Sequence, residues 1–258
     1  MNDLRKQAYE FISLLEYSKC AVVFTGAGIS TDSGIPDYRT PRKGLWENFD
    51  QSVVSLDGFL NNPSRYYSYA LELHPIRSFA RPNSAHYMLA KFEEKGLLKG
   101  IVTQNVDGLH YDAGSRNVYE LHGSLREFVC LSCYTYKSAE GVMERVKNGE
   151  NPPRCKKCNG ILKPNAVFFG EALPRIPWEK SVELVNNADL FISIGSSLQV
   201  SPANNLPRIA IKNNAKFIII NLMDTPYDNY ADLLIKNNVS ELSKVVLEIM
   251  QFNRQTTK

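Results

Sequence analysis

The sequence predicts an α/β protein, in which a doubly wound parallel sheet carries a smaller, inserted zinc-binding domain. Two observations favour the sheet: short apolar runs recur along the chain, and segments with helical periodicity lie between them. One observation favours the insertion, because two Cys-x-x-Cys pairs interrupt this alternation. The chain has 258 residues, of which 43% are hydrophobic and 22% are charged. This length and composition suffice for a buried core and exclude a disordered or low-complexity chain.

Four apolar runs are typical of buried parallel strands, and each is followed by polar residues or glycine. The runs span residues 20–25, 100–103, 190–194 and 216–220. The polar ends begin at Gly26, Gln104, Gly195 and Asn221. In doubly wound sheets, ligands bind beyond the carboxyl ends of the strands. We therefore expect the four polar ends to form one site.

Helical patterns connect these runs. They cover residues 83–95, before the second run, and 177–187, before the third. Residues 37–82 are irregular and rich in proline, asparagine, arginine and aromatic residues. A segment of this length is typical of a lid or binding loop, while a small helical subdomain packed through its tyrosines fits the same composition. The sequence leaves both interpretations open.

Four of the five cysteines predict a zinc site. Cys130 and Cys133 form one pair, and Cys155 and Cys158 form the other, inside the stretch 128–163. Nothing in the sequence marks secretion, so four thiolates around a structural zinc ion explain the pairs better than disulfides do. Unrelated or redox-active thiols are the less favoured alternative. Cys20 opens an apolar run, and we expect it in the core.

The charge balance argues against several partner classes. Thirty Lys and Arg face 27 Asp and Glu, a net charge of +3, which is too small to predict nucleic acid or an anionic membrane as the main partner. The N-terminus resembles neither a signal peptide nor a spanning helix. We expect a cytoplasmic monomer with no direct nucleic-acid or membrane partner. A zinc module that recruits such a partner on an inert fold is the competing interpretation.

The segment that starts at Gly26 reads Gly-Ala-Gly-Ile-Ser-Thr after the first run. It should open a helix, whose amides near Gly26 and Gly28 can approach a pyrophosphate. The third glycine of the dinucleotide fingerprint is missing, so a tight turn without a ligand is equally compatible with the pattern. The same absence disfavours an ordinary hydride-transfer dehydrogenase.

His122 is a candidate general base because of its expected neighbours. Gln104, Asn105 and Asp107 should lie near it if the sheet prediction is right. Their amides suit a ribose or a carboxamide, and an imidazole that titrates near neutral pH suits proton abstraction from a ribose hydroxyl. The other three histidines have surroundings that favour structural roles.

Together these motifs resemble the sirtuin family of NAD-dependent protein deacylases, particularly its bacterial and archaeal deacetylases. The resemblance spans about residues 17–239. The motifs stand in order: Gly26-Ala-Gly-Ile-Ser, Gly34-Ile-Pro-Asp-Tyr-Arg, Thr103-Gln-Asn-Val-Asp-Gly-Leu-His, Leu121-His-Gly, the cysteine pairs, Pro164-Asn-Ala-Val-Phe-Phe-Gly-Glu, Gly195-Ser-Ser-Leu and Asn221-Leu. The resemblance implies a Rossmann-type domain from residues 1–37, 83–127 and 164–258. It implies a zinc module at 128–163, and a helical or loop part with the cofactor loop at 38–82.

The resemblance also implies the site residues. The implied cofactor-binding residues are Ala27, Gly28, Thr31, Asp37, Tyr38, Arg39, Gln104, Asn105, Val106, Asp107, His122, Gly195, Ser196, Ser197, Asn221, Asn238 and Val239. His122 and Asn105 are implied to be catalytic, with His122 as the base. Val167, Phe168 and Gly170 are implied to hold the substrate peptide by backbone pairing. Tyr38 departs from the phenylalanine that is usual at its position.

The implied reaction transfers the acetyl group of acetyl-lysine to ADP-ribose from NAD, releasing nicotinamide and O-acetyl-ADP-ribose. The alternatives are a protein ADP-ribosyltransferase and a deacylase that prefers longer neutral acyl groups. Relatives that remove succinyl or malonyl groups carry a tyrosine and an arginine where this chain has Ala70 and Leu73. We therefore expect neutral acyl groups, because Arg65 or Arg77 would replace that arginine only if the alignment slips.

Overall fold

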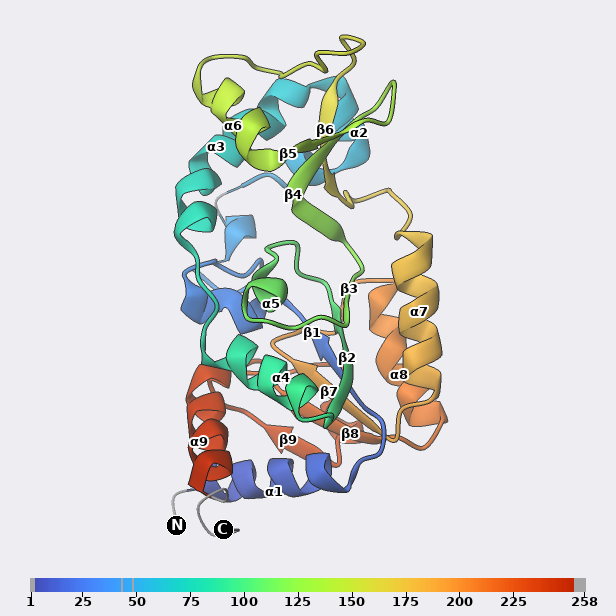
Figure 1. Ribbon diagram of the computed structural model, residues 1–258. Helices are drawn as coiled ribbons and strands as arrows, with labels where there is room; N and C mark the ends of the chain where they lie inside the picture. The colour runs from blue at the N-terminus through green and yellow to red at the C-terminus, as the bar shows by residue number, and fades with distance from the viewer. Residues whose placement is uncertain (1–2, 43, 48, 253–258) are drawn as a thin grey trace.

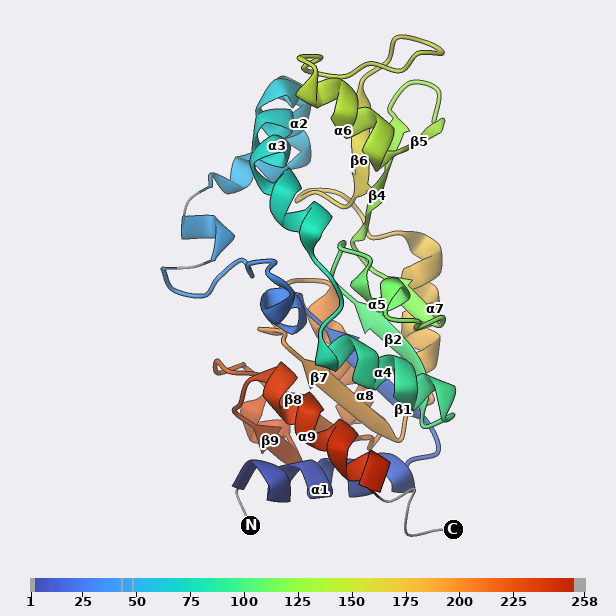
Figure 2. The same ribbon diagram turned by 60° about the vertical axis from the view of Figure 1, so that its left-hand side comes forward.

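The computed structural model of the chain describes residues 3–42, 44–47 and 49–252. A large parallel sheet flanked by helices occupies one end of the molecule, and a small antiparallel sheet occupies the other, as Figure 1 shows. Helix α3 (Pro63–Phe79) leads from the small sheet towards the large one, which is seen from a second direction in Figure 2. The predicted fold class, a Rossmann-type doubly wound sheet with a smaller zinc-binding domain, is confirmed.

The large sheet contains six parallel strands in the order β3-β2-β1-β7-β8-β9. Their bounds are β1 (Ala21–Thr25), β2 (Leu98–Thr103), β3 (Val118–Glu120), β7 (Leu190–Ile194), β8 (Lys216–Ile220) and β9 (Leu233–Ile235). The four predicted runs are β1, β2, β7 and β8, whereas the three-residue strands β3 and β9 were not predicted. The chain order reverses between β1 and β7, and this reversal opens a crevice at their carboxyl ends.

Helices cover both faces of this sheet because successive side chains in each strand point to opposite sides. On one side, Val23 and Ile101 pack in a core with residues of α1, α4 and α9. On the other side, Val22 and Val102 pack with residues of α7 and α8. The bounds are α1 (Asp3–Tyr17), α4 (Ser84–Glu94), α7 (Arg175–Asn186), α8 (Leu206–Lys212) and α9 (Val239–Phe252).

The predicted helix at 83–95 is α4, and its start follows from one side chain. Asn83 accepts a hydrogen bond from the Ala85 amide at 2.9 Å, which satisfies an otherwise free N–H group of the first turn. The helix predicted at 177–187 is α7, which begins two residues earlier than expected. Shorter helical turns are η1 (Ala27–Ser33), η2 (Leu45–Glu47), η3 (Gln51–Val54), α5 (Leu109–Asp112), η4 (Ala203–Asn205) and η5 (Asp228–Tyr230).

The small domain is built on a three-stranded antiparallel sheet in the order β5-β4-β6. Its elements are β4 (Gly123–Cys130), β5 (Tyr136–Ser138), α6 (Ala139–Lys147) and β6 (Leu162–Ala166), with α2 (Leu56–Asn61) and α3 packed against them. The core contains Phe59, Tyr67, Phe128 and Leu162. The sheet thus extends beyond residues 128–163 at both ends.

The tyrosines of the irregular stretch answer one open question. Tyr66, Tyr67 and Tyr69 are buried in α3 and pack in the core of the small domain. Residues 56–79 are therefore a helical subdomain, and only the part before α2 has the loop character of a lid. Among the described helices, none combines the length and the apolar character that crossing a membrane requires.

Candidate active site

Three glycines bring β1 and β7 close together at the crevice. The Gly28 amide donates to the Gly195 carbonyl at 2.8 Å, and a Cβ atom on either Gly26 or Gly28 would lie 2.8 Å from that oxygen. Gly195 has a φ of 61°, which favours glycine. The Gly26 amide donates to the Ile194 carbonyl. The amides of Gly26 and Gly28, which we expected to approach a pyrophosphate, therefore bond to the last residue of β7 and to the glycine that follows it. The turn opens the 3₁₀ helix η1.

A cavity of ≈ 250 Å³ lies at the carboxyl ends of β1, β2, β7 and β8. The predicted site residues that line it are Ala27, Gly28, Asp37, Tyr38, Arg39, Gln104, Asn105, Val106, His122, Val167, Phe168, Gly170, Gly195, Ser196, Ser197 and Asn221. The polar strand ends thus meet at one site, as the sheet prediction required. A larger cavity of ≈ 830 Å³ adjoins it and shares Ala27, Tyr38 and Asn105 in its wall.

Four of the predicted cofactor-binding residues do not line the first cavity. Asp107 lines the adjoining cavity. The hydroxyl of Thr31 donates to the Gly28 carbonyl inside η1 at 3.0 Å. The side chain of Asn238 accepts from the Glu241 amide at the start of α9, and Val239 is buried in the core of the large domain. In this structure, Thr31, Asn238 and Val239 therefore shape turns and packing near the site.

His122 is held in the tautomer that a general base needs. Its Nδ1 lies 2.9 Å from the backbone carbonyl of Gln104, and a carbonyl only accepts, so Nδ1 carries the proton. The Nε2 lone pair is left for the cavity that the ring lines. Burial lowers the pKa of His122, and the bond to Gln104 opposes this shift. The imidazole is therefore neutral at pH 7 and able to accept a proton.

A buried polar network orients Asn105 and Asp107. The hydroxyl of Ser30 donates to Asp107 at 2.8 Å and accepts from Asn105 Nδ2 at 3.2 Å. Because the Asn105 amide nitrogen bonds to Ser30, its Oδ1 is left to the cavity as an acceptor. Burial raises the pKa of Asp107, and bonds from Leu109 and Ser30 oppose this shift.

The loop before α2 places aromatic rings over the cavity. Tyr38 and Trp46 have ring centroids 4.9 Å apart. Asp37 shapes the loop, because its carboxylate accepts from the amides of Arg39 and Thr40 at 3.1 and 2.8 Å. Gln104 joins β2 to β7 through a 2.8 Å bond from Nε2 to the hydroxyl of Ser196.

Sequence reasoning missed several residues of the cavity wall. Trp46, Tyr66, Tyr69, Arg77 and Phe169 all line the first cavity. The tyrosines form a visible cluster in the sequence, but such a cluster does not distinguish packing from ligand binding. Trp46, Arg77 and Phe169 had no spacing or periodicity that set them apart.

Ala70 and Leu73 line the adjoining cavity, on the same face of α3 as Arg77. The structure therefore brings Arg77 to this wall without any slip in the alignment. The Arg77 guanidinium carbon lies 5.9 Å from the centre of the Tyr69 ring. Among the described residues, no carboxylate forms an ion pair with Arg77.

The segment after β6, residues 167–170, belongs to neither sheet. The Val167 amide donates to the His122 carbonyl at 2.8 Å, and the Phe169 amide donates to the Val54 carbonyl at 3.0 Å. The Leu56 amide donates to the Phe169 carbonyl at 2.9 Å. The segment is thus bonded to the backbone of His122 at Val167, and to residues on either side of Ser55 at Phe169.

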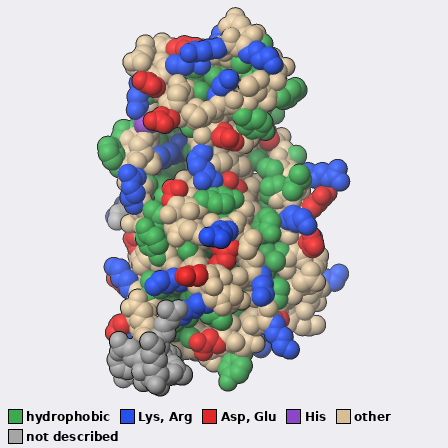
Figure 3. Space-filling view, in the orientation of Figure 1, with side chains coloured by type: hydrophobic (Ala, Val, Ile, Leu, Met, Phe, Trp, Pro, Cys, Tyr) green, Lys and Arg blue, Asp and Glu red, His purple; other side chains and the backbone are tan. Residues whose placement is uncertain are grey.

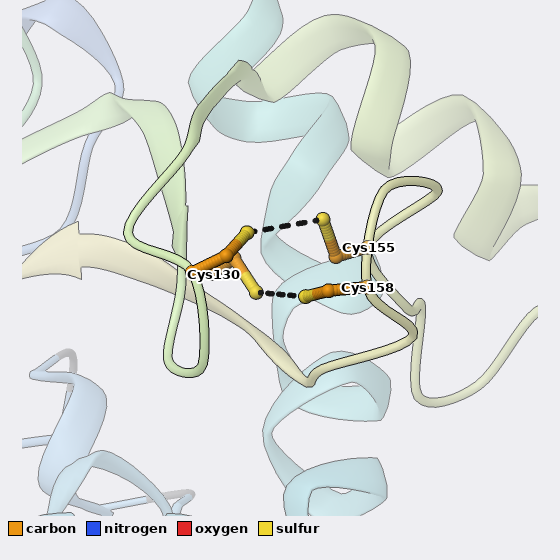
Figure 4. Close-up of side chains that lie close together, drawn as sticks. Cys130, Cys155 and Cys158 are labelled. Atoms are coloured by element: carbon orange, nitrogen blue, oxygen red, sulfur yellow. Dashed lines mark hydrogen bonds between the residues drawn. The ribbon is translucent and has the colours of Figure 1, made fainter.

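The four predicted cysteines form a metal site at the far end of the small domain. Their sulfur atoms lie within 4.8 Å of one another. Cys130 and Cys158 are 3.4 Å apart, and Cys133 and Cys155 are 3.8 Å apart. Figure 4 shows the sulfur atoms of the labelled cysteines directed towards one another. A zinc ion about 2.3 Å from each sulfur would separate them by roughly 3.8 Å, so the four thiolates fit structural zinc.

Charged side chains do not gather into a patch of one sign on the face seen in Figure 3, where basic and acidic groups are interspersed. This distribution agrees with the small net charge of the whole chain. It offers no broad basic stripe of the kind that binds nucleic acid on that face.

Known proteins match this fold and site over nearly the whole chain. The NAD-dependent protein deacetylase of Thermotoga maritima is 42% identical over 93% of this chain and 96% of its own. That of Sulfolobus acidocaldarius is 44% identical over 98% of this chain and 99% of its own. A solved Sir2 protein with a deacetylated p53 peptide and 3′-O-acetyl-ADP-ribose superposes with a TM-score of 0.90. It is 42% identical and covers 93% of this chain and 97% of that one. The Sir2 family model matches residues 26–202, and the chain therefore belongs to the Sir2 family.

Proposed function

We propose that this chain removes acetyl groups from lysine side chains of proteins in an NAD-dependent reaction. The observation that carries the proposal is His122, a neutral base whose Nε2 is free, at the wall of a cavity made by four polar strand ends. The chain is an NAD-dependent protein deacetylase: the acetyl group passes to ADP-ribose, and nicotinamide and O-acetyl-ADP-ribose are released. The names of its relatives and the product bound in the related structure support this reaction.

The cavity residues fit NAD by their chemistry. When bound, NAD supplies a sugar carbon that becomes electrophilic as nicotinamide leaves. The Oδ1 atom of Asn105 offers an acceptor for a ribose hydroxyl or the nicotinamide amide. Gln104 and Ser196 fix the tips of β2 and β7 relative to one another. We assign Asn105 both a binding role and a catalytic role, which the sequence resemblance also implies.

His122 accepts the proton of a ribose hydroxyl at Nε2. The Gln104 carbonyl holds the ring orientation and binds the proton on Nδ1, so it also favours the imidazolium that forms. Tyr38 and Trp46 cover the cavity from the loop. Exclusion of water there protects the electrophilic sugar from simple hydrolysis.

The peptide substrate is proposed to bind along Val167, Phe168 and Gly170. This segment lines the cavity and is not a strand of either sheet. An added peptide strand would use its remaining backbone groups. The four-cysteine zinc site lies outside the cavity and takes a structural role, because its ligands leave no open coordination position.

We further propose a cytoplasmic monomer that acts on acyl-lysine proteins without nucleic acid or membrane. Four zinc-binding thiols fit a reducing compartment, and the small net charge fits a neutral peptide partner.

Mass spectrometry of an acetyl-lysine peptide tests the function. The peptide should lose its acetyl group only when NAD is present, with one nicotinamide released for each acetyl group removed. Release of nicotinamide with ADP-ribose attached to protein and no deacetylation would instead identify an ADP-ribosyltransferase.

A further inference from the structure

Lys163 is buried in β6, four residues before the proposed peptide-binding segment. Its side chain is 5% exposed, and among the described residues no other Lys, Arg, Asp or Glu is buried. A buried charge is costly unless it is paired and hydrogen-bonded. Lys163 therefore makes polar contacts that an apolar residue at this position in β6 could not make.

Among the described residues, the Lys163 ammonium contacts only residues 164–171, which follow it in the chain. The Nζ atom donates to the carbonyls of Pro164 and Ala166 at 3.2 and 2.7 Å. It pairs with Glu171 Oε2 at 2.8 Å. It also lies 4.2 Å from the centre of the Phe168 ring, at a distance typical of cation–π contacts.

Glu171 closes this arrangement into a loop. Its Oε2 accepts from the Phe168 amide at 2.7 Å, and its own amide donates to the Phe168 carbonyl at 3.0 Å. Gly170, with a φ of 92°, occupies the third position of this turn, where a positive φ is required in a type II turn. The ammonium thus contacts the Phe168 ring directly, and it also pairs with the carboxylate that binds the Phe168 amide.

We propose that Lys163 and Glu171 are positioning residues for the peptide substrate, because they hold residues 167–170 in the conformation that the peptide must pair with. This inference rests on the proposed peptide site. It predicts a larger effect on the peptide than on NAD, since the Lys163 ammonium contacts only residues 164–171, although Glu171 also lines the first cavity.

The test is steady-state kinetics on Lys163→Met, with peptide and NAD varied separately. The loss of a charged, buried hydrogen-bond set should raise the KM for acetyl-peptide roughly tenfold or more. The KM for NAD should stay within about twofold, and kcat should change much less than the peptide KM. Lys163→Arg, which keeps the charge, should restore most of the peptide affinity.

Lys180→Met is the matched control. Lys180 pairs with Glu183 at 2.9 Å on the solvent-exposed side of α7, so its loss removes an ion pair without touching the segment. If Lys163→Met fails to fold, Glu171→Gln carries the test, because it removes the carboxylate and keeps the shape. It should raise the peptide KM in the same direction.

Two results would overturn the inference. An unchanged peptide KM in either variant, when that variant is folded, excludes the positioning role. Equal rises in the KM for acetyl-peptide and the KM for NAD indicate a general loss of structure. Phe168→Ala separates this inference from the proposed peptide site. If Phe168→Ala raises the peptide KM and Lys163→Met does not, only the role of Lys163 is wrong. If neither does, residues 167–170 are not the peptide site.

Discussion

Each of the two domains of this protein is stabilised internally in a different way. In the large sheet, β7 is buried along its whole length and Phe217–Ile220 of β8 are buried too, with helices on both faces. In the small sheet, β5 has no buried residue, and Tyr134 and Cys158 nearby are exposed. The small domain combines an aromatic core under α2 and α3 with four cysteines at its outer end.

This difference explains where the chemistry lies. Packing fixes the backbone of the large sheet, so polar side chains at its strand ends can be oriented by hydrogen bonds alone. The outer end of the small domain buries too little apolar surface to be stable without a ligand, because small modules depend on metal for much of their folding energy.

Removal of zinc should have the largest effect. Structural zinc contributes about 10–16 kcal/mol of apparent binding free energy, which is coupled to local folding. A strong chelator should therefore unfold β4, β5 and α6, abolish activity and leave β1, β2, β7 and β8 protected. Hydrogen exchange resolved by segment measures this difference directly.

Cys20→Ser is the control for thiol loss, because Cys20 lies outside the cluster. Its metal content and exchange pattern should match those of the unmodified chain. Elemental analysis that finds no zinc in active, freshly purified protein would contradict the role assigned to the cysteines.

His122→Ala should have the next largest effect, on catalysis alone. Removal of a general base typically costs about 10²–10⁴ in rate. NAD binding and thermal stability should persist, because the ring lines a cavity and fills no core. Single-turnover deacetylation together with calorimetric NAD binding measures both, and near-normal turnover in the folded variant would remove His122 from the mechanism.

The same residue predicts the acid limb of the pH profile. Burial lowers the pKa of His122 below the ordinary value of 6.5, so the base stays neutral until the pH falls below that value. The activity of the unmodified protein should therefore be flat through neutral pH and fall on the acid side. A fall that begins above pH 7 would contradict this assignment.

The contrast between packing and metal also shows what the sequence could predict. The β7 and β8 strands were predicted at their true bounds because four of the five residues in each are apolar, which is typical of a buried parallel strand. The three-residue strands β3 and β9 are too short for any period to be seen. The cysteine cluster was predictable because its ligands are paired along the chain.

The cavity was only partly predictable, since its wall comes from distant segments. His122 was predicted because polar strand ends were expected near it. Trp46 and Arg77 line the cavity only because of the path that the chain takes between β1 and α4. The bonding of the Gly28 amide to Gly195 depends on the distance between two strands, which no local pattern gives. Lys163 carried no signal, because burial of one lysine in β6 follows from the turn at residues 168–171.

Two buried histidines predict acid sensitivity of the large domain. Burial lowers the pKa of His86 to about 4 and that of His110 to about 3, from 6.5. The unfolded chain then binds more protons at acid pH, so stability is full above pH 6.5 and declines as the pH falls towards the folded pKa values. Each histidine should cost roughly 2 kcal/mol between pH 7.5 and pH 5.

Urea unfolding at the two pH values measures this loss. Of the two tryptophans, Trp178 lies in α7 of the large domain, so a Trp46→Phe background assigns the fluorescence change to that domain. His86→Gln should reduce the pH dependence by its share. Equal slopes for both proteins would show that His86 does not titrate on unfolding.

The smallest predicted effect concerns the acyl group, at the place where the two domains meet. Ala70 and Leu73 of the small domain line the cavity next to Asn105 of the large one, and neither can bind a carboxylate. We expect catalytic efficiency on acetyl-lysine to exceed that on succinyl-lysine about tenfold or more, because a buried carboxylate without a partner is disfavoured.

Arg77 limits the size of this preference, since its guanidinium lines the same cavity without an ion-pair partner among the described residues. Arg77→Leu should therefore lower succinyl activity further and leave acetyl activity nearly unchanged. A wild-type preference for succinyl-lysine that Arg77→Leu abolishes would show that α3 of the small domain supplies a carboxylate-binding group to the active site.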